Sequence, residues 1–349
     1  MRPEPGPPVA LSTASVYPEP VAAGFELAAE LGYDGVELMV WGDRVSQDVA
    51  AVGKLAERHG VPVVAVHAPC LAVTQRVWGA DPIVRIRRSV AAAEQLGAST
   101  VVLHPPFRWQ QRYAARFADE VARAGEVAGV ALAVENMFPV VRGRVRTVPY
   151  EPGFDPTEVG YRYYTLDLSH TATAGTDALE LLDRMGAGLR HVHLADGSGG
   201  PRDEHLVPGR GTQPCAEVLQ RLVDMDYRGA VVAEVSTRRC RTRYERAEML
   251  AHTLLFARLH LQPIDRNEDA ARPTIGVRAS ERPPASGRAG QRPRTGGREP
   301  ERPPTRGRVG QRPRTGGREP GPVPAESRAG QPPPTGGHAP ERPPATGRV

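Results

Sequence analysis

The sequence predicts a (β/α)8 barrel, or TIM barrel, over residues 1–272 and a disordered tail rich in Arg, Pro and Gly over residues 273–349. Eight short apolar runs alternate with amphipathic stretches between residues 9 and 260, as the strands and helices of such a barrel do. After Ile275 the chain has no Leu, Ile, Phe, Tyr or Trp, so the tail has nothing from which to build a core. A doubly wound parallel sheet also fits the alternation, but it would not explain where the polar residues described below lie.

The expected strands are short runs rich in apolar and β-branched residues. They span 9–13, 35–40, 61–67, 100–104, 130–135, 164–168, 190–194 and 230–235. The segment 137–163 interrupts the alternation because it is rich in Pro, Tyr and Arg. There we expect at most a short helix, near residues 155–159.

The expected helices lie between these strands. They span 20–31, 46–59, 81–96, 113–128, 174–187, 214–226 and 240–260. Proline in the first turn indicates two helix starts, with Asp81 and Thr212 as the N-cap residues. A glycine follows four of the helical runs, where a left-handed C-terminal cap is expected: Gly32, Gly60, Gly97 and Gly129.

The two predicted parts carry opposite net charge. Residues 1–272 hold 30 Lys and Arg against 34 Asp and Glu, whereas residues 273–349 hold 15 Arg against 6 Glu. The isoelectric point of about 9.4 therefore arises from the tail, and it does not indicate a barrel that binds nucleic acid.

The sequence gives no sign of a membrane or an oxidising compartment. No run approaches the roughly 18 apolar residues of a membrane span. The N-terminus, MRPEPGPP, lacks the apolar stretch of a signal peptide. Three scattered cysteines, Cys70, Cys215 and Cys240, cannot form a disulfide framework. We therefore expect a cytoplasmic protein with no membrane partner.

The tail repeats with a period of 20 residues. Its first two copies, ERPPASGRAGQRPRTGGREP and ERPPTRGRVGQRPRTGGREP, differ at three positions. Solenoid repeats have similar periods but need apolar positions in every unit, so we expect a solvated extension. Alternatively, its arginines could hold it loosely on RNA, DNA or anionic lipid.

Residues of the types that bind metal ions lie at the ends of six expected strands. They are His67, His104, Glu135, Asp167, His193 and Glu234. Two further groups extend the set, namely His170 three residues after Asp167, and Asp203 with His205 after the seventh strand. His191 points the same way as His193 but lies one pleat deeper, so we expect it to be a packed or hydrogen-bonded residue.

In a parallel barrel all these strand ends meet at one rim, so the nine side chains should converge. Each alone could be an ordinary hydrogen-bonded rim residue. Together they favour a metal site, because burying several carboxylates without cations would cost too much free energy. Nitrogen and carboxylate donors without cysteine favour Zn²⁺, with Mn²⁺, Co²⁺ or Mg²⁺ as alternatives.

Several motifs resemble the xylose isomerase-like barrel superfamily, which includes sugar-phosphate isomerases and epimerases and the endonuclease IV type of apurinic-site nuclease. The matching segments are GYDGVEL at 32–38, VVLHP at 101–105, VEN at 134–136, LDLSH at 166–170, HVHLAD at 191–196, DEH at 203–205, PGRG at 208–211 and AE at 233–234. They extend over nearly the whole predicted barrel.

The resemblance implies two nested sets of metal ligands. In the isomerase and epimerase branch, one divalent ion would be held by Glu135, Asp167, His193 and Glu234, and the two glutamates would move protons beside the carbonyl of a sugar. In the nuclease branch, three zinc ions would also use the positions matching His67, His104, His170, Asp203 and His205. His170 is then either a metal ligand or a hydrogen-bond partner of the substrate.

We expect a metal-dependent isomerase or epimerase acting on a small sugar or sugar phosphate, with Glu135 and Glu234 as catalytic residues. The first strand, VALST, lacks the histidine-valine-serine start of the nuclease branch, and an acidic barrel is poorly suited to DNA. The alternative is a zinc-dependent apurinic-site endonuclease. Arg142 and Arg210 are the expected phosphate-binding residues, and Trp78 is expected to wall the pocket.

Overall fold

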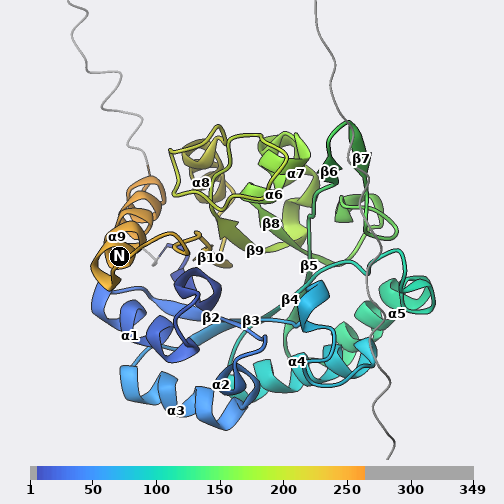
Figure 1. The fold of residues 1–349 in the computed structure, drawn as a ribbon, viewed down its shortest axis with the longest axis horizontal. Coiled ribbons are helices and arrows are strands. Elements are labelled where there is room, and N and C mark those ends of the chain that lie inside the picture. Colours follow the sequence, from blue (N-terminus) through green and yellow to red (C-terminus); the bar gives the residue numbers. More distant parts are fainter. Residues whose placement is uncertain (1–5, 264–349) are drawn as a thin grey trace, which may run out of the picture. The chain divides into compact units, whose positions relative to one another are not determined.

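Eight parallel strands form a closed barrel with helices around its outside (Figure 1). The computed structural model describes residues 6–263, so the predictions for the tail lie outside the described residues. The barrel strands are β1 (Val9–Ser12), β2 (Gly35–Met39), β3 (Val63–His67), β4 (Thr100–Leu103), β5 (Ala131–Glu135), β8 (Tyr163–Asp167), β9 (Leu189–Leu194) and β10 (Ala230–Ala233). They follow one another in this order around the barrel, and β10 returns to pair with β1. The predicted TIM barrel is confirmed.

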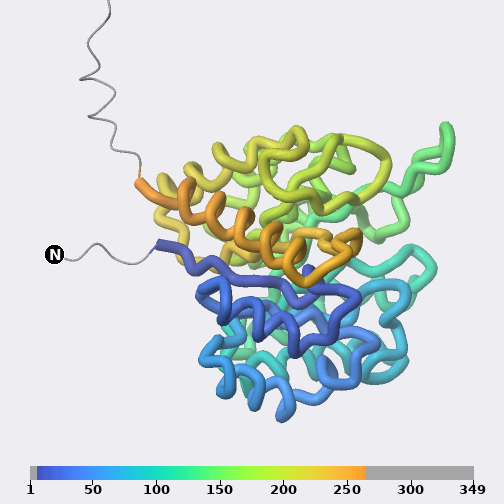
Figure 2. The backbone as a smooth tube through the Cα atoms, turned by 60° about the vertical axis from the view of Figure 1, so that its left-hand side comes forward, coloured from blue at the N-terminus to red at the C-terminus, as the bar shows by residue number. Residues whose placement is uncertain are grey.

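The helices pack against the outer faces of the strands. They are α1 (Val21–Leu31), α2 (Arg44–Gln47), α3 (Val49–His59), α4 (Pro82–Leu96), α5 (Gln111–Val127), α6 (Leu168–Ala174), α7 (Ala178–Met185), α8 (Cys215–Asp224) and α9 (Arg243–His260). Short 3-10 helices span Thr13–Val16, Ala72–Thr74, Pro156–Glu158 and Gly186–Gly188. Figure 2 shows α9 lying beside the N-terminal part of the barrel, where Tyr33 donates a hydrogen bond to the carbonyl of Leu250 over 2.7 Å. None of the helices within residues 6–263 is both long and apolar enough to span a bilayer.

An aspartate starts a new helix at two places. One divides the expected helix 46–59, whereas at the other α6 lies almost wholly before the expected helix 174–187 and was not predicted. Asp48 accepts a hydrogen bond from the backbone of Ala51 over 3.0 Å and separates α2 from α3. Asp177 accepts from Leu179 over 2.9 Å and separates α6 from α7. An Asp side chain that satisfies free N–H groups of the first turn favours a new start over continuation.

The predicted caps are partly confirmed. Asp81 accepts from the backbone of Ile83 over 2.9 Å, as predicted. Thr212 was expected to cap α8 and does not, because its hydroxyl donates to the carbonyl of Gly197 over 3.2 Å. Of the four glycines predicted as caps, Gly32, Gly60 and Gly97 end helices in the left-handed conformation. Gly129 is not a cap, since α5 ends at Val127 and is followed by an extended Ala128.

The segment 137–163 contains a hairpin that the sequence did not predict. Its strands are β6 (Val140–Arg142) and β7 (Val145–Thr147), paired antiparallel and mostly exposed. The expected short helix is present as Pro156–Glu158.

The strands bury apolar residues against the helices and polar residues inside the barrel. Val36, Leu38, Leu166, Val192 and Leu194 belong to the hydrophobic core beneath the helices and are fully buried. The residues that alternate with them are also buried but polar: Glu37, Thr165, Asp167, His191 and His193. Because alternate residues of a strand point to opposite faces, the barrel interior is a polar compartment that opens at the carboxyl ends of the strands.

Candidate metal centre

The structure brings the nine predicted ligand residues together at the carboxyl ends of the strands. His67, Glu135 and Asp167 end β3, β5 and β8, His193 lies in β9, His104 and Glu234 follow β4 and β10, His170 belongs to α6, and Asp203 and His205 lie in the loop after β9. Seven of them are buried, and Asp203 and His205 are half-buried. Their role as metal ligands stays a prediction, and their contacts decide whether they suit it.

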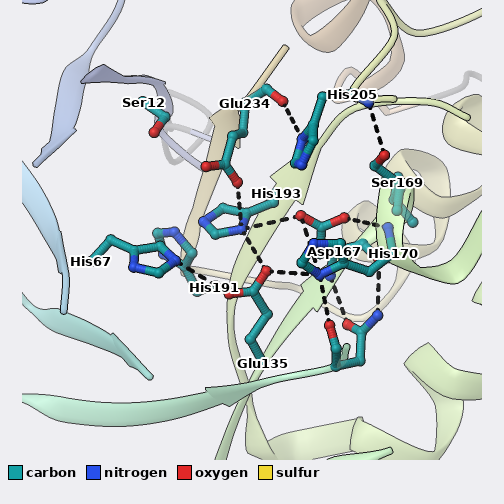
Figure 3. A network of polar contacts seen from close by, with 12 residues as sticks. Ser12, His67, Glu135, Asp167, Ser169, His170, His191, His193, His205 and Glu234 are labelled. Atoms are coloured by element: carbon teal, nitrogen blue, oxygen red, sulfur yellow. Dashed lines mark hydrogen bonds and ion pairs between the residues drawn. The ribbon is translucent and has the colours of Figure 1, made fainter. Parts of the chain in front are cut away.

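Three carboxylates approach one nitrogen at the centre of this cluster, Nδ1 of His193. Its distances are 2.9 Å to Glu234 Oε2, 3.2 Å to Glu135 Oε1 and 3.4 Å to Asp167 Oδ2. Figure 3 shows Glu234 and Glu135 approaching the His193 ring from two sides. One N–H group cannot satisfy three carboxylates, and Asp167 Oδ2 is buried without a hydrogen-bond donor among the described residues. These four side chains therefore fit a divalent cation.

A second convergence adjoins the first through Glu135. The Nε2 atoms of His67 and His104 lie 3.1 Å apart, and Glu135 Oε2 lies 3.4 Å and 3.0 Å from them. Glu135 thus turns one carboxylate oxygen toward His193 and the other toward this histidine pair. Such a carboxylate is placed to be shared by two cations.

A third convergence surrounds Asp203. Its Oδ2 lies 2.9 Å from Nε2 of His205 and 3.4 Å from Nε2 of His170. The hydroxyl of Ser169 donates to Asp203 Oδ1 over 2.6 Å and accepts from the backbone N–H of His205 over 2.9 Å. His205 has a φ of +46°, a strained conformation for a residue other than glycine, which these contacts hold in place.

The histidines are oriented by their second ring nitrogens. Each Nδ1 donates to a backbone carbonyl. That of His67 donates to Ala68 O over 3.0 Å, that of His170 to Asn136 O over 2.8 Å, and that of His205 to Glu234 O over 2.7 Å. Each of these contacts turns Nε2 toward a carboxylate, where it can offer an electron pair to a metal ion once its proton is lost. This is the arrangement by which proteins orient metal-binding imidazoles.

His193 is oriented in the opposite sense by Glu37, which the sequence reading did not select. Glu37 Oε2 accepts from Nε2 of His193 over 3.1 Å and from Nε2 of His191 over 2.7 Å. Its other oxygen accepts from the hydroxyl of Ser12 over 3.1 Å, and all four residues are fully buried. His193 therefore presents Nδ1 to the three carboxylates. The expectation that His191 is a packed, hydrogen-bonded residue is confirmed.

The charges of the cluster hold one another ionised. Burial by itself would raise the pKa of Glu135, but His193 and His104 outweigh it and hold that pKa well below its ordinary value. Burial would lower the pKa of His193, yet Glu234 and Glu37 raise it well above its ordinary value. His104 differs, because burial dominates and lowers its pKa. A buried set of ionised carboxylates is what a cation site requires.

The loop that carries Asp203 and His205 is held by a buried carboxylate. Asp196 accepts backbone N–H groups from Gly197 (2.8 Å), Gly209 (2.9 Å), Gly211 (2.8 Å) and Gln213 (3.0 Å). A Cβ atom on Gly211 would lie 2.3 Å from Asp196 Oδ1 and 2.4 Å from the carbonyl oxygen of Gly197, so only glycine fits there.

A cavity of about 870 Å³ opens beside the cluster. Glu234 and His205 line it at the metal-ligand end, and its walls include Tyr17, Trp41 and Arg238. Of the two predicted catalytic glutamates, Glu234 borders this cavity, whereas Glu135 is 1% exposed and is not among the residues that line it.

The three predicted substrate-binding residues lie elsewhere. Arg142 is exposed on the β6–β7 hairpin, and Arg210 is exposed in the loop after β9. Trp78 donates its indole N–H to the carbonyl of Gln47 over 3.1 Å. Within residues 6–263, no contact links these three side chains to the nine ligand residues.

Two buried carboxylates outside the predicted set, Glu37 and Asp196, have a recognisable sequence signal. Glu37 is the only charged residue in the otherwise apolar strand GVELM, and Asp196 follows the strand LRHVHL at its rim end. A charge in a buried strand needs a partner, but the sequence does not say which one. Asn136 ends the VEN segment at 134–136, and its side-chain amide exchanges two hydrogen bonds with the backbone of Asp167, over 2.8 Å and 3.0 Å.

Comparison with known proteins gives one family and several relatives. A family model described as xylose isomerase-like TIM barrel matches residues 25–259. An uncharacterized protein of Mycobacterium tuberculosis is 57% identical over 272 residues, covering 72% of this chain and 97% of the relative. A fructoselysine 3-epimerase of Escherichia coli is 25% identical over 244 residues, covering 62% and 86%. The crystal structure of a D-tagatose 3-epimerase-like protein is similar in fold, with a TM-score of 0.52, 22% identity and coverage of 73% of this chain and 100% of that one.

Proposed function

Because the chain belongs to the xylose isomerase-like TIM-barrel family, we propose that it is a divalent-metal-dependent isomerase or epimerase of a small sugar or sugar phosphate. The observation that carries this proposal is the meeting of Glu234, Glu135 and Asp167 at Nδ1 of His193, beside a cavity of about 870 Å³. That volume lies within the range of small-molecule sites. The similarity to a fructoselysine 3-epimerase supports the same class of reaction.

Glu135, Asp167, His193 and Glu234 would hold the metal ion. When bound, such an ion polarises the carbonyl of the substrate and lowers the free energy of the enediolate formed beside it. Zn²⁺ suits this donor set, and Mn²⁺, Co²⁺ and Mg²⁺ remain alternatives.

Glu234 is the proposed base. It borders the cavity, and although burial would raise its pKa, His193 and His205 lower that pKa below its ordinary value, so the carboxylate form is favoured. Glu234 would remove the proton from the carbon beside the substrate carbonyl. Glu135, which approaches His193 from the other side and is itself ionised, would first take up a proton from solvent and then deliver it to the opposite face of that carbon or to its neighbour. The first outcome is epimerisation and the second is isomerisation.

A second candidate is a zinc-dependent apurinic-site endonuclease that hydrolyses a phosphodiester bond. The convergence of His67 and His104 on Glu135, and of His170 and His205 on Asp203, favours it, because these contacts provide donors for more than one ion. Against it stands the acidic balance of residues 1–272, since phosphate contacts supply much of the affinity for DNA.

The primary test is exchange of substrate protons with solvent. The metal-loaded protein is incubated in deuterium oxide with a panel of ketoses and ketose phosphates, and nuclear magnetic resonance follows deuterium entering beside the carbonyl. Glu234→Gln and Glu135→Gln should each abolish exchange and weaken metal binding. The matched control is Glu126→Gln on the exposed face of α5, which should exchange normally. Full exchange in either site variant would contradict the assigned roles.

Metal content and strand cleavage separate the two candidates. We expect more than one divalent ion per chain by elemental analysis after preparation without chelator, and one or none would remove the multi-metal alternative. In parallel, cleavage of a DNA duplex containing an abasic site is assayed with the unmodified protein, His67→Ala and His205→Ala. All three proteins carry the same basic tail, so nonspecific binding of DNA by the tail is the same in each. Cleavage that disappears in both variants would establish the nuclease in place of the isomerase.

A further inference from the structure

The cavity continues beyond Glu234 into a part that the proposed proton transfer does not use. Its walls come from the segments after β1, β2, β3 and β10 and include Tyr17, Trp41, Val73 and Arg238. A substrate that reaches Glu234 with its reacting carbon would extend its remaining atoms along these walls. They are therefore the surfaces that select the rest of the substrate.

Two aromatic rings and a guanidinium group form this wall. The rings of Tyr17 and Trp41 lie 5.4 Å apart in an edge-to-face arrangement. The guanidinium carbon of Arg238 lies 5.3 Å from the centre of the Tyr17 ring, which is within range of a cation–π interaction. Tyr17 thereby holds the side chain of Arg238 at the wall, while the N–H groups of the guanidinium stay available to donate hydrogen bonds to a ligand.

The acidic residues of the same wall are already committed to other partners. Glu19 forms an ion pair with the buried Arg246. Asp43 accepts backbone N–H groups from Val21 and Val45, each over 3.0 Å. Arg238, by contrast, is exposed and has no carboxylate partner among residues 6–263. It is a cation without a counter-ion in a barrel whose overall balance is acidic.

We infer that Arg238 binds an anionic group, a phosphate monoester or a carboxylate, at the far end of the carbohydrate substrate. The planar guanidinium matches both groups through paired N–H donors. Tyr17 and Trp41 would cover the apolar face of the chain or ring between that group and Glu234. The inference rests on the proposed isomerase or epimerase function and moves anion recognition from Arg142 and Arg210 to Arg238.

Three six-carbon ketoses that differ only at carbon 6 provide the test. D-fructose carries a hydroxyl there, D-fructose 6-phosphate a phosphate and D-fructuronate a carboxylate. Calorimetric titration of the metal-loaded full-length protein should give at least tenfold tighter binding of one anionic sugar than of D-fructose, because a charged hydrogen-bonded pair contributes about that much. Whichever of the two anions is preferred identifies the group.

Variants assign the preference to Arg238. Arg238→Gln should bind the anionic sugar and D-fructose equally, and Arg238→Lys should keep part of the difference because it keeps the charge. Arg239→Gln is the matched control. Arg239 is the exposed neighbour of Arg238 and does not line the cavity, so this variant should retain the full preference. Equal binding of the three sugars, binding of none, or a preference that survives in Arg238→Gln would overturn the inference.

The same samples separate this inference from the proposed function. If deuterium enters the sugars but the protein binds no anionic sugar more tightly than D-fructose, the proposed isomerase function is supported and the role of Arg238 is overturned. An Arg238-dependent preference without exchange on any ketose would support the anion site and count against the isomerase.

Discussion

At the scale of single residues, Glu37 determines which nitrogen His193 offers to the candidate metal site. One oxygen of Glu37 accepts hydrogen bonds from both His191 and His193, so both Nε2 atoms carry protons. Nδ1 of His193 is then left to face Glu135, Asp167 and Glu234. The position of Glu37 in the barrel interior therefore affects a ligand atom that it does not touch.

Replacing Glu37 by Gln should weaken metal binding about 10- to 100-fold, the usual effect of losing a group that orients a ligand. The amide keeps the size of the side chain but carries no charge, so its hydrogen bonds to the two imidazoles are weaker and hold His193 less firmly in orientation. Co²⁺ titration against a competing chelator measures the affinity, and the visible spectrum of Co²⁺ reports the geometry of its ligands.

Ser12→Ala is the matched control for Glu37→Gln, because Ser12 contacts only the other oxygen of Glu37, over 3.1 Å. It should change the affinity for Co²⁺ far less. An unchanged affinity and spectrum in Glu37→Gln would mean that His193 is oriented by its packing alone.

At the scale of elements, the loop between β9 and α8 is held by one buried carboxylate. Asp196 gathers four backbone N–H groups of this loop, and Gly211 lies so close to it that a methyl group would collide. Since the same loop carries Asp203 and His205, its shape and the third convergence of donors are coupled.

Gly211→Ala should lower the stability by about 1–3 kcal/mol, the typical effect of an added group in a packed place. It should also reduce the number of bound metal ions, because displacing the loop separates Asp203 from His170. Thermal unfolding and elemental analysis measure the two effects. Gly129→Ala has open space around its Cβ position and should change neither. Normal metal content in a destabilised Gly211→Ala protein would show that the loop and the site are independent.

The elements also mark where prediction from the sequence succeeds and where it fails. The eight strands are predictable because each is a buried apolar run between turn residues, and strand-end polar residues such as His67 and Glu135 must then meet at one rim. The β6–β7 hairpin is not, since residues such as Val140, Arg142 and Val145 are mostly exposed and leave no burial pattern. The expectation that Trp78 walls the pocket depends on its place in the segment after β3, and a loop position does not set the direction of a side chain.

At the scale of the whole molecule, the polar barrel interior would couple the proposed binding of metal to the release of protons. Burial lowers the pKa values of His170, His193 and His205, but the surrounding carboxylates outweigh it and raise all three, that of His205 to about 10. In the metal-free protein these imidazoles therefore keep their protons at pH values where free histidine has lost them. A metal ligand must be unprotonated, so binding has to displace those protons.

We expect more than one proton to be released per chain when the metal-free protein binds Zn²⁺ near pH 7. Affinity should accordingly rise as the pH rises from about 6.5, the ordinary value for histidine, toward the raised values. Calorimetric titrations in two buffers of different ionisation enthalpy give the proton count. Heats that do not depend on the buffer would show that the histidines are already neutral.

The closure of the barrel by β1 and β10 brings in Glu234, the last in sequence of the four side chains proposed to hold the metal ion. Leu11 in β1 pairs beside Ala233 in β10, and Glu234 is the next residue. A nascent chain that has not yet emerged from the ribosome as far as β10 has two open sheet edges, at β1 and β9, and lacks this last ligand. The step that seals the edges is therefore also the step that completes the carboxylates around His193. A truncated chain that ends before β10 would expose strand edges that favour aggregation, and it would lack one of the four proposed metal ligands.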